Sequence, residues 1–183
     1  MKILSISLIA ILSKICLGAN ESNFANQTID IGIVVKDINR SLQFYKDVVG
    51  FEQKEGFQVG GSFPKLVGLT DGTNLKISVL RLGNEETATK LKLMQVHGKK
   101  PTRVVNQSYI HSIAGFSYLT IFVKDVDKVL NNAIKNGVKP HAKSPQILPK
   151  GLPQDVCLLM LKDPDGNFIE IVGPLTTKLK TRR

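Results

Sequence analysis

One segment of this chain occurs twice, and this internal repeat limits the folds open to it more than any other feature of the sequence. Residues 31–42 (IGIVVKDINRSL) match residues 119–130 (LTIFVKDVDKVL) at a constant offset of 88 positions. Each copy begins as an alternating β-branched run and changes to helical spacing after an aspartate, Asp37 or Asp125. Both aspartates suit an N-cap, because a carboxylate accepts hydrogen bonds from free helix N–H groups. The repeat predicts two copies of one strand–helix unit.

Each predicted helix ends at a glycine, Gly50 or Gly137, where a left-handed C-cap is favoured. The residues expected on the buried helix faces are Leu42, Tyr45 and Val49 in the first copy and Val129, Ala133 and Ile134 in the second. The strand-like runs that follow the helices are 51–57, 75–82 and 90–96, then 138–142, 156–161 and 167–172. Each copy is therefore predicted to be a βαβββ module.

The two ends of the chain differ in character from the modules. Residues 1–19 combine an early lysine, a short apolar run and small residues at the end, which is the pattern of a cleaved export signal. A membrane anchor is the alternative. The expected organisation is a signal peptide over 1–19, a linker over 20–27, a first module over 28–98, a linker over 99–115, a second module over 116–174 and a basic tail over 175–183. Export to a periplasm or out of the cell follows from this organisation.

Charge and cysteine usage narrow the classes of partner. The formal net charge is +10, and the excess lies around residues 99–103 and in the tail. No aromatic residues alternate with these cations, so we expect solvated charge, no nucleic-acid partner and no membrane partner once the signal is removed. Signal removal leaves Cys157 as the single cysteine. Its apolar surroundings in sequence predict a core residue and not a nucleophile.

Three phrases of the sequence resemble the vicinal oxygen chelate superfamily, which includes glyoxalases, bleomycin-resistance proteins and extradiol dioxygenases. They are residues 31–51 (IGIVVKDINRSLQFYKDVVGF), 115–130 (GFSYLTIFVKDVDKVL) and 161–174 (LKDPDGNFIEIVGP). The resemblance implies an α+β fold in which tandem βαβββ modules form a curled mixed sheet around a cup-shaped cavity. It also implies a small-molecule ligand, and it leaves a homodimer open, because members of this superfamily often pair modules across chains.

In many enzymes of that superfamily a divalent ion is held by His, Glu or Gln from the first and last strands of both modules. Carried over residue by residue, the four positions are Asp30, Lys92, Tyr118 and Glu170. Only Glu170 keeps the usual identity, and a protonated lysine has no lone pair to offer a cation. We therefore expect these four residues to line a ligand cavity with a degenerate metal site and no cofactor. A divalent metal ion bound by an atypical ligand set is the alternative.

A sharper hypothesis follows from the charges at these positions. Two unpaired carboxylates in a partly dry cavity repel each other, and an ammonium can remove that conflict as a metal does. Lys92 is predicted to bond both Asp30 and Glu170, with the Tyr118 hydroxyl completing the network. The three histidines, His97, His111 and His141, fall on none of the four positions.

Three functions are consistent with this sequence. The first is an exported glyoxalase- or dioxygenase-like protein that binds a small oxygenated molecule in the sheet cavity. The second is a metal-dependent lyase, isomerase or dioxygenase with an atypical ligand set, in which Glu170 is the candidate catalytic base. The third is a non-catalytic scaffold or interaction protein. Whether the chain is an enzyme is left open at this level.

Overall fold

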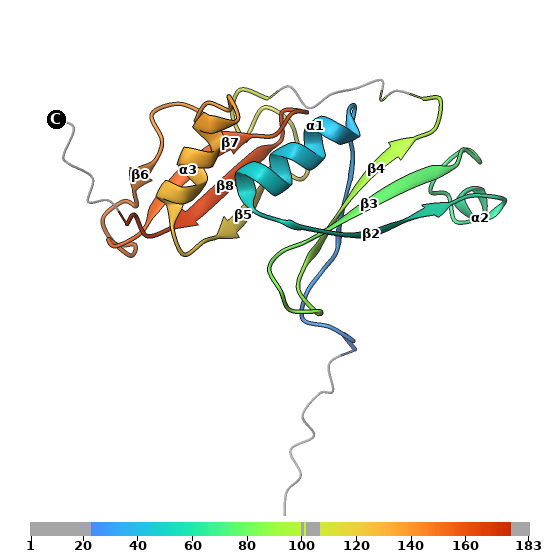
Figure 1. Ribbon diagram of the computed structural model, residues 1–183, viewed down its shortest axis with the longest axis horizontal. Coiled ribbons are helices and arrows are strands. Elements are labelled where there is room, and N and C mark those ends of the chain that lie inside the picture. The colour runs from blue at the N-terminus through green and yellow to red at the C-terminus, as the bar shows by residue number, and fades with distance from the viewer. Residues whose placement is uncertain (1–22, 100, 102–106, 177–183) are drawn as a thin grey trace, which may run out of the picture.

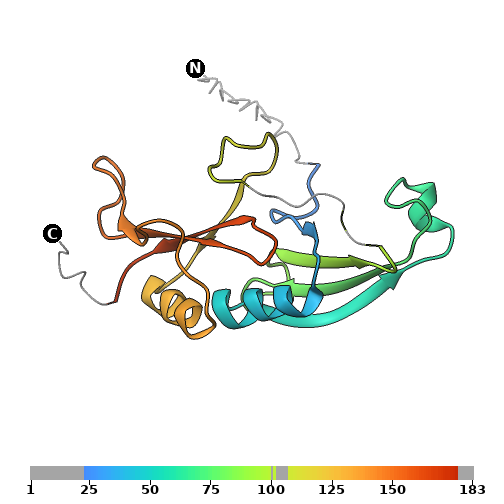
Figure 2. The same cartoon turned by 90° about the horizontal axis from the view of Figure 1, so that it is seen from above.

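The computed structural model describes residues 23–99, 101 and 107–176 of the chain, so the expected signal peptide lies outside the described residues. Two four-stranded mixed sheets lie next to each other, with strand orders β1-β4-β3-β2 and β5-β8-β7-β6. Figure 2 shows the longer helices together on one side of both sheets. The fold is α+β with two βαβββ modules, as predicted, although the sheets stay separate instead of forming one continuous sheet.

The first module follows the predicted order of elements and adds one short helix. Its elements are β1 (Ile31–Val34), α1 (Ile38–Gln43), the π-helix η1 (Phe44–Val49), β2 (Glu52–Val59), α2 (Phe63–Leu66), β3 (Leu75–Arg81) and β4 (Lys90–Val96). β1 pairs with β4 in parallel, and β2, β3 and β4 pair antiparallel. Helix α2 was not predicted and lies at the far end of the first sheet (Figure 1).

The second module repeats this topology with a shorter outer strand. Its elements are β5 (Tyr118–Phe122), α3 (Val126–Lys135), β6 (Gln146–Ile147), β7 (Cys157–Lys162) and β8 (Phe168–Gly173). β5 pairs with β8 in parallel, and β6, β7 and β8 pair antiparallel. The predicted strand at 138–142 is wrong, because Pro140 has no N–H to donate and Ala142 takes a left-handed conformation with φ 55°.

The caps place both helices where the repeat predicted them. The Asp37 carboxylate accepts hydrogen bonds from the N–H groups of Asn39 and Arg40, and Asp125 accepts one from Lys128. Gly50 and Gly137 have φ of 101° and 72°. Such values are easy for glycine because it has no Cβ, and they turn the chain out of each helix.

Val35 and Val123 occupy equivalent places at the ends of β1 and β5, as the repeat required. The Val35 N–H donates to the Met94 carbonyl at 3.0 Å, and the Val123 N–H donates to the Val172 carbonyl at 2.9 Å. Each bond joins the first strand of a module to its last strand. The first and last strands therefore pair in the same register in both modules.

One hydrophobic core lies between the helices and the sheets and is shared by both modules. It joins Tyr45 and Val48 of η1 to Val129 and Ala133 of α3, with apolar residues of β3, β4, β7 and β8 below them. Cys157 is buried in this core, as predicted, and burial raises the pKa of its thiol. Ile134 was expected in the core and is instead 61% exposed, since the buried stripe of α3 runs through residues 126, 129, 130 and 133.

A buried polar contact also ties the modules together. The turn between β7 and β8 brings Asp163 under η1, where its carboxylate accepts a hydrogen bond of 2.8 Å from the Tyr45 hydroxyl. Next to it, the Asp165 carboxylate accepts from the Lys36 N–H at 3.3 Å. This turn is therefore a contact between the modules as well as a connection between two strands.

Candidate functional site

The four positions inferred from the sequence lie on the face of the sheets that is turned away from α1 and α3, which we call the open face. Alternation along each strand establishes this. Leu91 and Leu93 of β4 belong to the core, so Lys92 between them points to the open face. Ile169 and Ile171 of β8 are buried in the same core, so Glu170 does the same. The segment 107–117 before β5 and helix α2 stand on this side of the molecule (Figure 2). No helix within the described residues is long and apolar enough to cross a membrane.

In the first module the open face carries an ion pair. The Lys92 ammonium lies 2.8 Å from a carboxylate oxygen of Asp30, the residue just before β1. Their side chains are 33% and 40% exposed. The hydrogen bond from Lys92 lowers the pKa of the Asp30 carboxyl, so that the carboxylate is charged across the neutral range. The pair is half-open to solvent, and a ligand on this face could reach it.

In the second module the Glu170 carboxylate is bonded to a hydroxyl group instead of an ammonium. The Thr120 hydroxyl of β5 donates to one Glu170 oxygen at 2.6 Å. Tyr118 begins β5 and lies in register with Phe168, one row away from Glu170. Its ring is 48% exposed, and its hydroxyl makes no hydrogen bond to any residue that the structure describes. Thr120 was not singled out by the sequence analysis, although the offset of 88 places it at the equivalent of Gly32.

Strand register tests the equivalence of Lys92 and Glu170, because it does not depend on loop lengths. Lys92 stands opposite Gly32 in the β1–β4 pair, and Glu170 stands opposite Thr120 in the β5–β8 pair. Since Gly32 and Thr120 are related by the offset of 88, Lys92 and Glu170 occupy the same place in the two modules. A lysine in one module therefore stands where the other module has an acid.

The structure brings together only part of the predicted network. Lys92 pairs with Asp30, and Glu170 pairs with Thr120. Within the described part of the chain, no ion pair joins Lys92 to Glu170, and no cluster of three or more His, Cys, Asp or Glu residues could hold a metal ion. Each polar pair of the open face is satisfied within its own module.

Other groups border the second half of the open face. The Lys162 ammonium donates to the Gln107 carbonyl at 2.6 Å and lies 4.7 Å from the centre of the Phe168 ring. The His141 ring packs against the same phenylalanine. His111 stacks on Tyr109 in the linker, and His97 is an exposed residue after β4. On this half of the open face, the Phe168 ring therefore contacts both His141 and Lys162.

Comparison with known proteins supports the fold and the family. A family model described as the Glyoxalase/Bleomycin resistance protein/Dioxygenase superfamily matches residues 27–171. A search of curated proteins gave no significant match. Among solved structures, a glyoxalase family protein from Bacillus cereus superposes with a TM-score of 0.65 at 14% identity, over 85% of this chain and 98% of that one.

Two further structures share the fold at low identity. The trypanothione-dependent glyoxalase I of Leishmania major superposes with a TM-score of 0.53 at 24% identity, over 79% of this chain and 84% of that one. Glyoxalase I from Zea mays gives 0.57 at 20% identity, over 81% of this chain but 44% of that longer chain. The repeat, the module topology and a family match across most of its length show that this chain belongs to the glyoxalase/bleomycin resistance protein/dioxygenase superfamily.

Proposed function

We propose that this protein binds a small oxygenated molecule on its open face, and that it does so without a divalent ion. The observation that carries the proposal is the ion pair of 2.8 Å between Lys92 and Asp30. The ammonium stands at a position where the superfamily's enzymes supply a metal ligand, and it has three donors and no lone pair. It also occupies the carboxylate that a metal would need. The residues present do not fit a divalent ion.

The same groups suit an uncharged or weakly polar ligand that carries oxygens. One Lys92 donor is engaged by Asp30, which leaves others free for ligand oxygens. Glu170 keeps one carboxylate oxygen beyond the one that Thr120 bonds, and this oxygen can accept a ligand hydroxyl. Apolar contact is supplied by Tyr118 and Phe122, which project from β5 and are 48% and 78% exposed.

A second candidate function is proton transfer on the bound molecule. A carboxylate beside a bound carbonyl compound can remove a proton from the neighbouring carbon, and an ammonium can stabilise the negative charge that develops on oxygen. Glu170 and Lys92 are groups of these two kinds on one face. The free oxygen of Glu170 is the observation that favours this candidate. A scaffold role without any ligand is the third alternative.

Metal analysis combined with ligand binding separates these functions. Protein dialysed against EDTA should bind catechol or hydroxyacetone, both of which carry neighbouring oxygens, as well as untreated protein does in ligand-observed NMR. Lys92→Met should weaken this binding about tenfold, because a charged hydrogen bond is lost. Lys135→Met, on the exposed side of α3, is the matched control. Stoichiometric zinc, nickel or manganese in the untreated protein, with binding lost in EDTA, would favour the metal-dependent enzyme.

Two further proposals concern the protein's location and assembly. We infer export from the composition of residues 1–19, and intact-mass measurement on protein from the native host tests it. A mature chain lacking about 19 residues is the expected result, and recovery of the full chain in membranes would favour an anchor. A homodimer is supported by the fact that members of the superfamily often form dimers. Sedimentation of the mature protein at several concentrations measures its oligomeric state directly.

A further inference from the structure

The two modules differ most on the opposite face of the first sheet, under the helices. Strand register identifies equivalent residues in the third strands of the two modules, β3 and β7, as it does in the fourth strands, β4 and β8. Ser78 of β3 stands opposite Leu93, and Leu159 of β7 stands opposite Ile171, the residue after Glu170. Ser78 is therefore the equivalent of Leu159, and Lys76 is in the same way the equivalent of Cys157. Leu159 and Cys157 are 0% and 1% exposed core residues. The first module has a hydroxyl and an ammonium at these two core positions.

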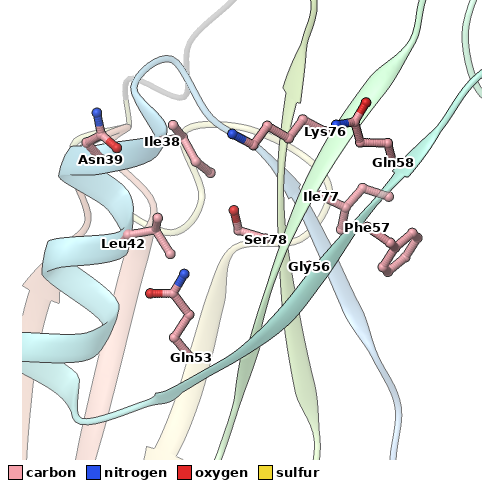
Figure 3. Close-up of a pocket in the computed structure, with 10 residues that line it drawn as sticks. All are labelled: Ile38, Asn39, Leu42, Gln53, Gly56, Phe57, Gln58, Lys76, Ile77 and Ser78. Carbon is pink, nitrogen blue, oxygen red and sulfur yellow. The ribbon is translucent and has the colours of Figure 1, made fainter.

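The helix of the first module leaves those two residues uncovered. Helix α3 packs on β7 and β8, whereas β4 is the strand that α1 mainly contacts. The result is an open hollow of about 330 Å³ between α1 and strands β2 and β3. Figure 3 shows the Ser78 hydroxyl and the Gln53 amide directed into it, with the Lys76 side chain reaching across toward Ile38. Small-molecule sites begin at roughly this size.

The backbone of β2 is irregular where it borders the hollow. Register shifts between Lys54 and Phe57, so that Glu55 and Gly56 together face the single residue Ser78. This is a β-bulge, an irregularity that often lies beside functional sites. A Cβ at Gly56 would stand 2.4 Å from the Ile77 carbonyl oxygen, so only glycine fits there. The second module has no counterpart, because its outer strand β6 is only two residues long.

The polar side chains around the hollow have no partners among the described residues. They are two glutamine amides, an asparagine amide, a hydroxyl and an ammonium, from Gln53, Gln58, Asn39, Ser78 and Lys76. Four apolar residues also line the hollow, Ile38 and Leu42 from α1 and Phe57 and Ile77 from the strands. Neither aspartate nor glutamate is among the ten lining residues, so the hollow has one positive charge and many hydrogen-bonding groups.

From these observations we propose a second binding site at this hollow, distinct from the open face, that takes a hydroxylated carboxylate of monosaccharide size. The amides and the Ser78 hydroxyl both donate and accept, which matches a row of ligand hydroxyls. Lys76 pairs with the carboxylate. Ile38 and Leu42 pack against the ligand's C–H face. A cationic ligand is disfavoured by Lys76, and a purely apolar one would leave five polar groups without partners.

The experiment titrates the full mature protein with D-glucuronate, D-glucose and acetate and follows amide resonances by NMR. D-glucuronate should bind saturably with a dissociation constant of about 1 mM, as expected for a small ligand in an open site. D-glucose should bind about tenfold more weakly, and acetate more weakly still. The shifted resonances should lie at residues 38–42, 53–58 and 76–78.

Two variants and a control decide the outcome. Ser78→Leu fills the hollow with the side chain that the second module has at this position, so it should fold and should abolish binding. Lys76→Gln should bring D-glucuronate down to the affinity of D-glucose. Lys54→Gln, a lysine on the open face of the same sheet, should change nothing. The proposal is overturned by no saturable binding, by undiminished binding in Ser78→Leu, or by shifts confined to the open face around Glu170. Each of these results leaves the open-face function untouched.

Discussion

The two modules share one backbone topology but differ in the residues that their strands place under the helices. In the second module, the residues of β7 and β8 under the helix are apolar and buried, and helix α3 is regular for ten residues. In the first module, α1 passes into a π-helix after six residues, and the strand below it carries Lys76 and Ser78. The second module is built as a core, while the first gives up part of its core for polar surface.

The same inequality holds on the open face. Equivalent positions carry a lysine bonded to Asp30 in one module and a glutamate bonded to Thr120 in the other. A symmetric metal site needs similar donors from both modules, whereas the equivalent residues Lys92 and Glu170 are opposite in charge. A duplicated fold can therefore keep its frame and lose the symmetry of its chemistry, because core packing and surface chemistry lie on alternate residues of the same strands.

Exchanging the equivalent residues of β3 and β7 should have the largest effect. Leu159→Ser should destabilise the protein by about 3–5 kcal/mol, because it leaves a cavity in the shared core and buries a hydroxyl without a partner. Ser78→Leu should change the free energy of unfolding by less than about 1 kcal/mol, because its side chain enters an open hollow. Denaturant unfolding of both variants measures this difference.

Leu159→Ala serves as a second variant if the serine protein fails to fold, and it should still cost about 2–5 kcal/mol. Equal losses at the two positions would mean that α1 covers Ser78 in solution as fully as α3 covers Leu159. The proposed difference between the two modules at this position would then be wrong.

A smaller effect on stability, which depends on pH, is expected at the polar contact between the modules, where Asp165 is buried. Burial raises the pKa of the Asp165 carboxyl, opposed in part by Lys36, and the nearby Asp163 raises it further. Asp165 Oδ2 is buried without a hydrogen-bond partner, and the neighbouring Ser41 hydroxyl likewise has none of good geometry. A folded-state pKa above the unfolded value means that the stabilising, protonated form is complete below about pH 4 and is lost as the pH rises through the folded pKa.

Asp165→Asn should therefore stabilise the protein by about 1 kcal/mol at pH 7, because it removes a charge that burial opposes and offers an N–H to Ser41. At pH 4 the variant and the wild type should differ much less. Thermal melts across pH 4 to 8 test this, with Asp47→Asn on the exposed side of η1 as control. A variant that is less stable at pH 7 would show that the charge of Asp165 is needed to join the modules.

Much of this architecture could be predicted from sequence because its signals are local. The VKD repeat, the capping aspartates and the terminal glycines each act within one turn of chain, and all lie where expected. The strand at 138–142 was wrong because a proline and the left-handed Ala142 override an apolar run. The prediction for Ile134 was wrong because the apolar residues of α3 are too many to fit on one narrow face. Packing against the sheet buries residues 126, 129, 130 and 133 and leaves Ile134 outside.

The sites depended on contacts between distant residues and were only partly predictable. Lys92 and Asp30 could be placed together through the family resemblance, and the structure joins them. Thr120 could have been found from the offset of 88, because a hydroxyl facing the only retained acid is a natural partner. The hollow beside Ser78 could not, because it arises from the different seating of α1 and α3 on their sheets, which no residue pattern encodes.

The smallest expected effect concerns the ion pair on the open face. If the pair were buried, Lys92→Met would cost about 3–5 kcal/mol. The structure leaves both side chains about one-third or more exposed, so we expect a loss of only about 0.2–1 kcal/mol. Because Lys92 lowers the pKa of Asp30, the stabilisation is present above the ordinary aspartate value and is lost as the pH falls through the lowered one.

Urea unfolding at pH 7 and pH 3, with and without 1 M salt, measures this contribution. The difference between Lys92→Met and the wild type should shrink at pH 3 and in salt, which screens exposed charges. Lys135→Met is again the control. A loss above about 3 kcal/mol at pH 7 would mean that the pair is desolvated in solution. A bound molecule or a second copy would then cover the open face of the first module, and repeating the measurement at several protein concentrations would distinguish the two, because only the second copy's protection depends on protein concentration.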